Sequence, residues 1–83
     1  MKKKQVDSEV LRVEFNLSMK EIEELKRYCR EENRDIFEDI RANLCMVYMS
    51  NRLKKTIYFW QGKKVPKSLY KRYENRYLRM IND

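Results

Sequence analysis

Histidine is absent from this sequence, and glycine and proline occur only once each. Without histidine, zinc sites built from cysteine and histidine are excluded, and two cysteines alone are poor ligands for a structural metal site. A chain with so little glycine and proline is expected to be mostly helical and compact rather than rich in loops. No apolar run is long enough to span a membrane and no signal-peptide pattern is present, so we expect a cytoplasmic protein.

The usual signatures of an enzyme are also lacking. There is no glycine-rich phosphate loop, and no serine or cysteine stands beside a plausible base. We therefore expect no enzymatic activity, no catalytic residues and no cofactor. Cys29 and Cys45 are interpreted as small buried apolar side chains in helices, with a disulfide expected only in an oxidising or hyperthermophilic setting.

Positive charge is concentrated in the C-terminal half. The 83 residues carry a formal net charge of +7, and residues 45–83 contribute ten basic and two acidic groups, or +8. Such a concentration is typical of a surface that meets phosphates or other anions, although solubility alone also explains it. A chain of this length forms one small domain near the limit for a stable monomeric core, and dimerisation is a common remedy.

Residues 10–17 alternate between apolar and polar side chains, as a half-buried strand does. The apolar set is Leu11, Val13, Phe15 and Leu17, and the polar set is Arg12, Glu14 and Asn16. Because no second strand is evident, we expect the same strand of a second copy to pair with it. The two strands would form an antiparallel ribbon whose polar face fits the major groove of B-DNA.

A first helix is predicted from about residue 19 to residue 31. Ser18 is a good N-cap, and Glu21 three residues later completes the spacing of a capping box. Apolar side chains then recur at helical spacing. Asn33 tolerates the left-handed conformation that commonly ends a helix, so we expect the first helix to stop there.

Two more helices are predicted beyond this break. Asp35 can cap the second, and no glycine or proline interrupts it before Gly62, so it is expected to reach residue 55 or 60. Its expected core stripe is Ile36, Ile40, Leu44, Val47 and Tyr48. Pro66 suits the first turn of the third helix. The apolar stripe of this third helix is Leu69, Tyr73, Tyr77 and Met80.

Residues 11–44, LRVEFNLSMKEIEELKRYCREENRDIFEDIRANL, resemble the ribbon-helix-helix family of Arc- and MetJ-type DNA-binding proteins. The resemblance implies a mainly α fold: a ribbon-helix-helix homodimer with one N-terminal β-strand and two helices, here with an additional C-terminal helix. It divides the chain into a flexible basic arm at 1–9, a ribbon-helix-helix domain at 10–55 and a C-terminal helical extension at 56–83. Small regulators of archaeal viruses and plasmids carry similar extensions, and a viral protein would act in the host cell cytoplasm.

The resemblance also implies a function and the residues that perform it. The homodimer would be a sequence-specific regulator of transcription, most simply a repressor, that binds double-stranded DNA with its ribbon. The expected base-contacting residues are Arg12, Glu14 and Asn16, and the expected phosphate-contacting residues are Arg34, Asp35, Ile36, Lys71 and Arg72. The alternative for the three base-contacting residues is that they form only the solvated face of a dimer ribbon, which we regard as the less favoured interpretation.

A second class of function stays open at this point. In this alternative, the chain is a small helical interaction protein that binds a host or toxin protein through its basic C-terminal helix. Tyr70, Tyr73 and Tyr77 are interpreted as packing residues of that helix rather than as platforms for stacked bases.

Overall fold

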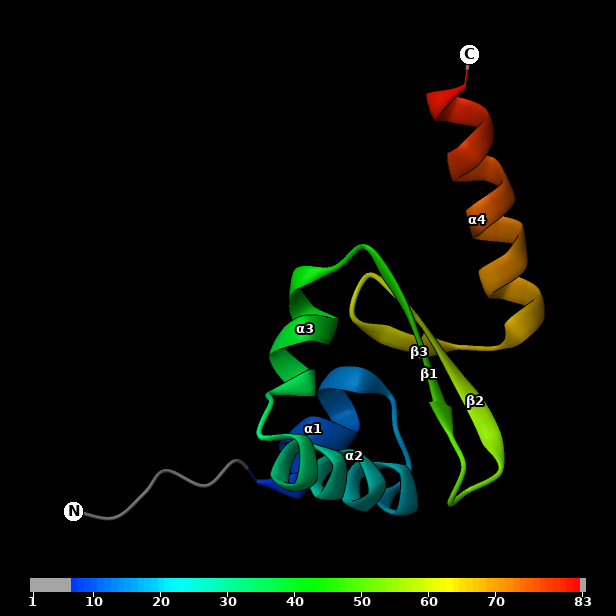
Figure 1. Ribbon diagram of the computed structural model, residues 1–83. Helices are drawn as coiled ribbons and strands as arrows, with labels where there is room; N and C mark the ends of the chain where they lie inside the picture. Colours follow the sequence, from blue (N-terminus) through cyan, green and yellow to red (C-terminus); the bar gives the residue numbers. More distant parts are fainter. Residues whose placement is uncertain (1–6, 83) are drawn as a thin grey trace.

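The structure is a computed structural model that describes residues 7–82. Its elements, in chain order, are α1 (Ser8–Phe15), α2 (Met19–Glu32), α3 (Ile36–Ala42), β1 (Cys45–Ser50), β2 (Lys55–Trp60), β3 (Lys63–Val65) and α4 (Lys67–Ile81). The strands form one antiparallel sheet in the order β1-β2-β3. In Figure 1, α1, α2 and α3 gather beside the sheet, while α4 rises away from the body. No helix within the described range is long and apolar enough to cross a membrane.

The predicted strand at residues 10–17 is wrong, because α1 occupies most of this segment. Asp7 caps the helix: its side chain accepts a hydrogen bond from the backbone N–H of Glu9 at 3.0 Å. Leu11 and Phe15, four residues apart, are both buried in the core. A short apolar set that contains such a pair fits a helix as well as a strand. The fold is therefore an α+β arrangement and not a ribbon-helix-helix homodimer.

The predicted flexible arm at 1–9 lies mostly outside the described residues. Residues 1–6 lie outside the described residues, and residues 7–9 belong to the cap and first turn of α1.

The first predicted helix is confirmed as α2, and so are its end signals. Ser18 and Glu21 form both hydrogen bonds of a capping box, at 3.2 and 2.8 Å between side chain and backbone. Asn33 ends the helix in the left-handed conformation, with φ of 52°. These local signals satisfy the backbone groups that a helix leaves unpaired at its ends.

The second predicted helix is far shorter than expected. Asp35 caps it as predicted, accepting from the backbone N–H of Glu38, but α3 ends at Ala42. Residues 45–60 form the β1–β2 hairpin instead of a continued helix. The run Thr56-Ile57-Tyr58-Phe59-Trp60 explains this difference, because β-branched and aromatic side chains favour strands.

Side chains of the hairpin alternate between the two faces of the sheet. Tyr48 and Ile57 are paired across β1 and β2, and both are buried on the face that packs with α1, α2 and α3. Val47 points to the opposite face and is exposed, so its predicted place in a core stripe is wrong. Leu44, predicted in the same stripe, is also exposed.

A two-residue turn connects β2 to β3. Gln61 and Gly62 both have positive φ, at 54° and 81°, and lie between the paired residues Trp60 and Lys63. This conformation is typical of the tight hairpin turns that follow the twist of a sheet. The turn brings β3 back along β2 and sets the starting point of α4.

Candidate nucleic-acid interface

The third predicted helix is confirmed as α4, and Pro66 is its N-cap rather than a residue of its first turn. Tyr70, only 7% exposed, anchors the helix on the outer face of the sheet. Its ring lies 5.1 Å from that of Tyr58 and 6.1 Å from that of Trp60. Tyr73 continues the contact, with its ring 5.3 Å from Trp60. The tyrosines at these two positions are therefore packing residues, as predicted.

The basic residues of α4 lie on the side of the helix away from these rings. At 100° per residue, they occupy the half-circumference opposite the apolar stripe that contains Tyr70 and Tyr73. We call this surface the cationic face of α4; its residues are Lys67, Lys71, Arg72, Arg76 and Arg79. All five are exposed, and none forms an ion pair within residues 7–82. Glu74 is the one acidic residue of the 45–82 segment.

Four of the five arginines in residues 7–44 pair with carboxylates, and Arg30 is the exception. Arg12 pairs with Glu9, and Arg34 pairs with Asp39 at 3.0 Å. Arg41 binds Glu14 through two nitrogens, at 2.7 and 3.1 Å. Residues 7–44 carry seven basic and eleven acidic groups, a net charge of −4, whereas residues 45–82 carry ten basic groups and one acidic group, a net charge of +9. The net positive charge of the described residues therefore lies on the sheet and α4.

Two lysines of the sheet are committed to a buried carboxylate. The Nζ atoms of Lys55 and Lys64 lie 2.6 and 2.8 Å from Glu21 Oε2, whose side chain is fully buried. Burial opposes ionisation of Glu21, but hydrogen bonds from the two lysines and from the backbone of Ser18 outweigh it and lower its pKa to about 2. These lysines connect α2 to β2 and β3, so we assign them a structural role.

Glu24, one turn further along α2, forms a second buried connection. Tyr48 and Ser50 of β1 donate hydrogen bonds to Glu24 Oε2 at 3.1 and 2.9 Å, and Arg27 donates to both of its oxygens. Burial opposes ionisation, but the hydrogen bonds from Arg27, Ser50 and Tyr48 lower the pKa of Glu24 overall. Burial and the nearby carboxylate raise the pKa of Tyr48 to about 12. This network secures α2 to β1.

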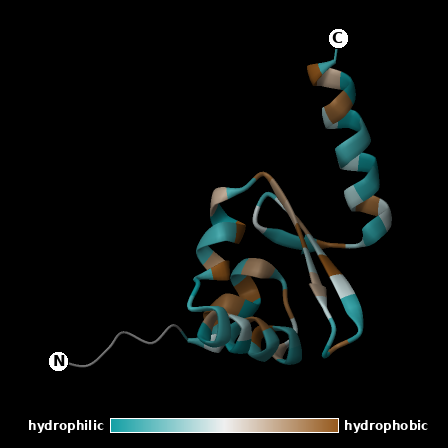
Figure 2. Ribbon diagram, in the orientation of Figure 1, coloured by the Kyte–Doolittle hydropathy of each residue, from teal (hydrophilic) through white to brown (hydrophobic). Residues whose placement is uncertain are grey.

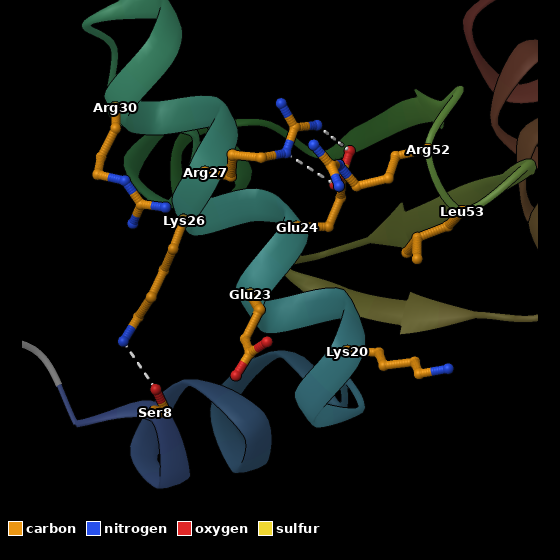
Figure 3. Close-up of a pocket in the computed structure, with 9 residues that line it drawn as sticks. All are labelled: Ser8, Lys20, Glu23, Glu24, Lys26, Arg27, Arg30, Arg52 and Leu53. Atoms are coloured by element: carbon orange, nitrogen blue, oxygen red, sulfur yellow. Dashed lines mark hydrogen bonds and ion pairs between the residues drawn. The ribbon is translucent and has the colours of Figure 1, made fainter.

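An open groove of about 550 Å³ runs along α2. It is lined by Ser8, Lys20, Glu23, Glu24, Lys26, Arg27, Arg30, Arg52 and Leu53. Figure 3 shows Arg27 and Arg52 converging on Glu24, while Lys26 reaches Ser8. Its arginines near Glu24 are thus occupied in holding the fold. Within residues 7–82, cysteine, aspartate and glutamate side chains form no cluster of three or more that could hold a metal ion.

The predicted base-contacting residues do not form a ribbon face. Arg12 and Glu14 lie on α1 and are engaged in ion pairs with Glu9 and Arg41. Asn16 is the left-handed C-cap of α1, and its side-chain amide donates to the backbone oxygen of Lys64 at 3.2 Å. Their expected role depended on a strand that the structure replaces with a helix.

The predicted phosphate-contacting residues fall into two groups. Arg34, Asp35 and Ile36 lie at the turn before α3, where Asp35 caps the helix and Ile36 is only 2% exposed. Lys71 and Arg72 lie on α4 and are exposed and unpaired among the described residues. The structure brings this last pair together with the other members of the cationic face and separates it from the turn.

Sequence reasoning missed the buried carboxylates Glu21 and Glu24 and their partners on the sheet. The run of β-branched and aromatic residues before the glycine turn was the signal for the missing strands. Once β2 and β3 are placed, Lys55 and Lys64 become candidates to meet α2. Comparisons with family models, with curated proteins and with solved structures find no match for this chain.

Proposed function

We propose that this protein binds double-stranded DNA by contacting its phosphates with the cationic face of α4. The observation that supports the proposal is the set of five exposed cations on that face with no ion pair in the described structure. Other surface arginines, such as Arg12, Arg34 and Arg41, have carboxylate partners, and among the described residues Arg30 on α2 is an isolated exception rather than part of a cluster. Cations left without carboxylates on one face are suited to binding an external polyanion.

The dimensions of α4 agree with those of a DNA duplex. At 1.5 Å per residue, Lys67 and Arg79 are separated by about 18 Å along the helix axis. Duplex DNA carries roughly ten phosphate charges over that length. The helix also projects from the body (Figure 1), and the major groove of about 12 Å admits one helix. We infer that α4 lies along the major groove with its cationic face towards the phosphates.

A sequence-specific regulator of transcription also needs groups that read bases. Asn75 is exposed and lies between Arg72 and Arg79 on the same half of α4. Its amide can form a bidentate pair with adenine, and a neighbouring arginine can do so with guanine. We propose that base reading takes place here rather than at Arg12, Glu14 and Asn16.

The proposal is tested with the full chain and a fluorescently labelled random-sequence duplex, by anisotropy over a range of salt concentrations. Replacing Lys71 and Arg72 with glutamine should weaken binding to all duplexes alike. It should also flatten the salt slope by roughly one unit for each lost phosphate contact.

The matched control replaces Lys20 and Arg30 with glutamine. Both are exposed on α2 and unpaired in the described structure, so the change in net charge is the same at another location. A much smaller effect in the control supports α4 as the contact surface. Equal effects of the two double variants would show that only net charge matters and would contradict the proposal.

A further inference from the structure

Helix α4 is longer than the sheet surface that supports it. Its apolar stripe continues beyond Tyr73 at the same helical spacing, but the last members lie beyond the body of the molecule. Tyr77, Met80 and Ile81 are 40%, 69% and 57% exposed. Figure 2 shows hydrophobic residues at this free end of the helix. An isolated helix of this length is marginal in water, so a surface that covers the stripe would stabilise it.

The outer face of the sheet is apolar over β1 but is not covered there by any described helix. Helix α4 packs against β2, where it lies over Tyr58 and Trp60. The neighbouring edge strand β1 points Val47 and Met49 to the same face, and they are 45% and 72% exposed. Within residues 7–82, the free end of α4 thus has exposed apolar side chains that pack on no sheet, and the outer face of β1 has exposed apolar side chains that no helix covers.

We propose that a second copy of the chain supplies both missing halves. In this two-fold symmetric dimer, the free end of α4 from each protomer packs on β1 of its partner. The two α4 helices then run antiparallel, side by side, over two neighbouring sheets. This inference goes beyond DNA binding and does not depend on it.

Three features favour a second copy as the occupant. The sheet order places β1 next to β2, the strand that α4 covers, so an antiparallel α4 of a second copy would lie beside α4 and over the exposed Val47 and Met49. The partner's helix would use the same sheet face that α4 already uses within its own chain. The five exposed side chains Val47, Met49, Tyr77, Met80 and Ile81 present on the order of 500 Å² per protomer, which with a polar rim approaches the roughly 800 Å² per partner of a standard interface.

The charges are also consistent with this arrangement. The apolar stripe of α4 excludes its cations, so the cationic faces of both protomers would point outward on one common surface. Like charges on that surface repel, and salt screens the repulsion. We therefore expect added salt to strengthen the dimer. DNA binding, by contrast, weakens with salt, so the two proposals can fail separately.

Sedimentation velocity of the free protein at micromolar concentrations tests the proposal. The parent chain should sediment with twice its monomer mass of 10.4 kDa. Two variants should each raise the dimer dissociation constant by about tenfold or more. The first is the double variant Met80→Ser/Ile81→Ser, which removes apolar side chains from the free end of α4. The second is Met49→Ser, which removes an apolar side chain from the exposed face of β1. None of these side chains is part of the core, so far-ultraviolet circular dichroism should show that each variant is folded.

Val13→Ser is the matched control, because Val13 is 65% exposed on α1 and lies outside the proposed interface. It should leave the dissociation constant unchanged. A monomeric parent chain would overturn the proposal. This holds also if the monomer binds anionic vesicles or another protein through the end of α4. So would a dimer that is lost in the Met80/Ile81 variant but retained in Met49→Ser, because the helix end would then cover a different surface.

Discussion

The side-chain amine of Lys64 on β3 lies 2.8 Å from the fully buried carboxylate of Glu21 on α2. Lys55 of β2 binds the same oxygen, so one carboxylate joins the helical layer to two strands. Glu21 also completes the capping box of α2 with Ser18. A residue that starts a helix therefore also determines where the sheet packs against it.

Replacing Glu21 with glutamine should destabilise the protein by about 3 kcal/mol, because two lysines would lose their buried counter-charge. Glutamine can still serve in a capping box, so the change isolates the ion pairs. Glu23→Gln on the exposed side of the same helix is the control and should have little effect. Urea unfolding near pH 7 measures both. A change below about 0.5 kcal/mol in Glu21→Gln would contradict the structural role.

The same carboxylate predicts how stability depends on pH. Its folded-state pKa of about 2 lies below the ordinary value of 4.5, so the ionised form stabilises the fold above pH 4.5. This contribution should be lost as the pH falls from about 4.5 towards 2. Urea unfolding across this range should show a steeper decline for the parent chain than for Glu21→Gln. Parallel declines would show that other acidic groups account for the acid sensitivity.

The hydroxyl of Tyr48 donates to buried Glu24 at 3.1 Å, so Tyr48→Phe should cost about 2 kcal/mol, as for a hydrogen bond to a charged group. Tyr73→Phe is the matched control, since the hydroxyl of Tyr73 has no hydrogen bond within the described range. Thermal unfolding monitored by circular dichroism compares the two. Equal midpoints would indicate that Tyr48 contributes packing alone.

A substitution at Arg12 distinguishes the observed helix α1 from the predicted DNA-binding ribbon. On an exposed strand of a DNA-binding ribbon, Arg12→Ala would reduce affinity for a preferred duplex and relax its specificity. On α1, where Arg12 pairs with Glu9, the same change should leave DNA affinity and specificity unaltered. Binding of the variant to duplexes selected from a random library by the parent chain checks this. A marked loss of affinity would place α1 in the interface and contradict the proposed contact surface.

The elements that local sequence signals determine could be predicted. Ser18 with Glu21 marks the start of α2, Asn33 marks its end, and Asp35 marks the start of α3. The positions of Lys71 and Arg72 on an exposed helical face also followed from periodicity alone. In each case the decisive interactions lie within a few residues along the chain.

The elements that depend on distant partners could not be predicted in this way. Leu11 and Phe15 fit both a strand and a helix, and only packing against the rest of the core selects α1. The segment that forms the β1–β2 hairpin contains no glycine or proline, so the pairing of the two strands, rather than a break in the sequence, distinguishes it from a continued helix. Lys55 and Lys64 lie beside Glu21 only because β2 and β3 pack against α2. Their ion pairs therefore could not be predicted without the sheet.

The most direct test of the central claim is a solution NMR titration of the ¹⁵N-labelled full chain with a short duplex at low salt. If the cationic face of α4 contacts phosphates, the largest amide shift changes should fall on residues 67–79, and they should reverse when salt is added. The amides of α2 that border the groove with Lys20 and Arg30 should move little. Shift changes concentrated on α2, or none at a duplex concentration that saturates the anisotropy signal, would contradict the account.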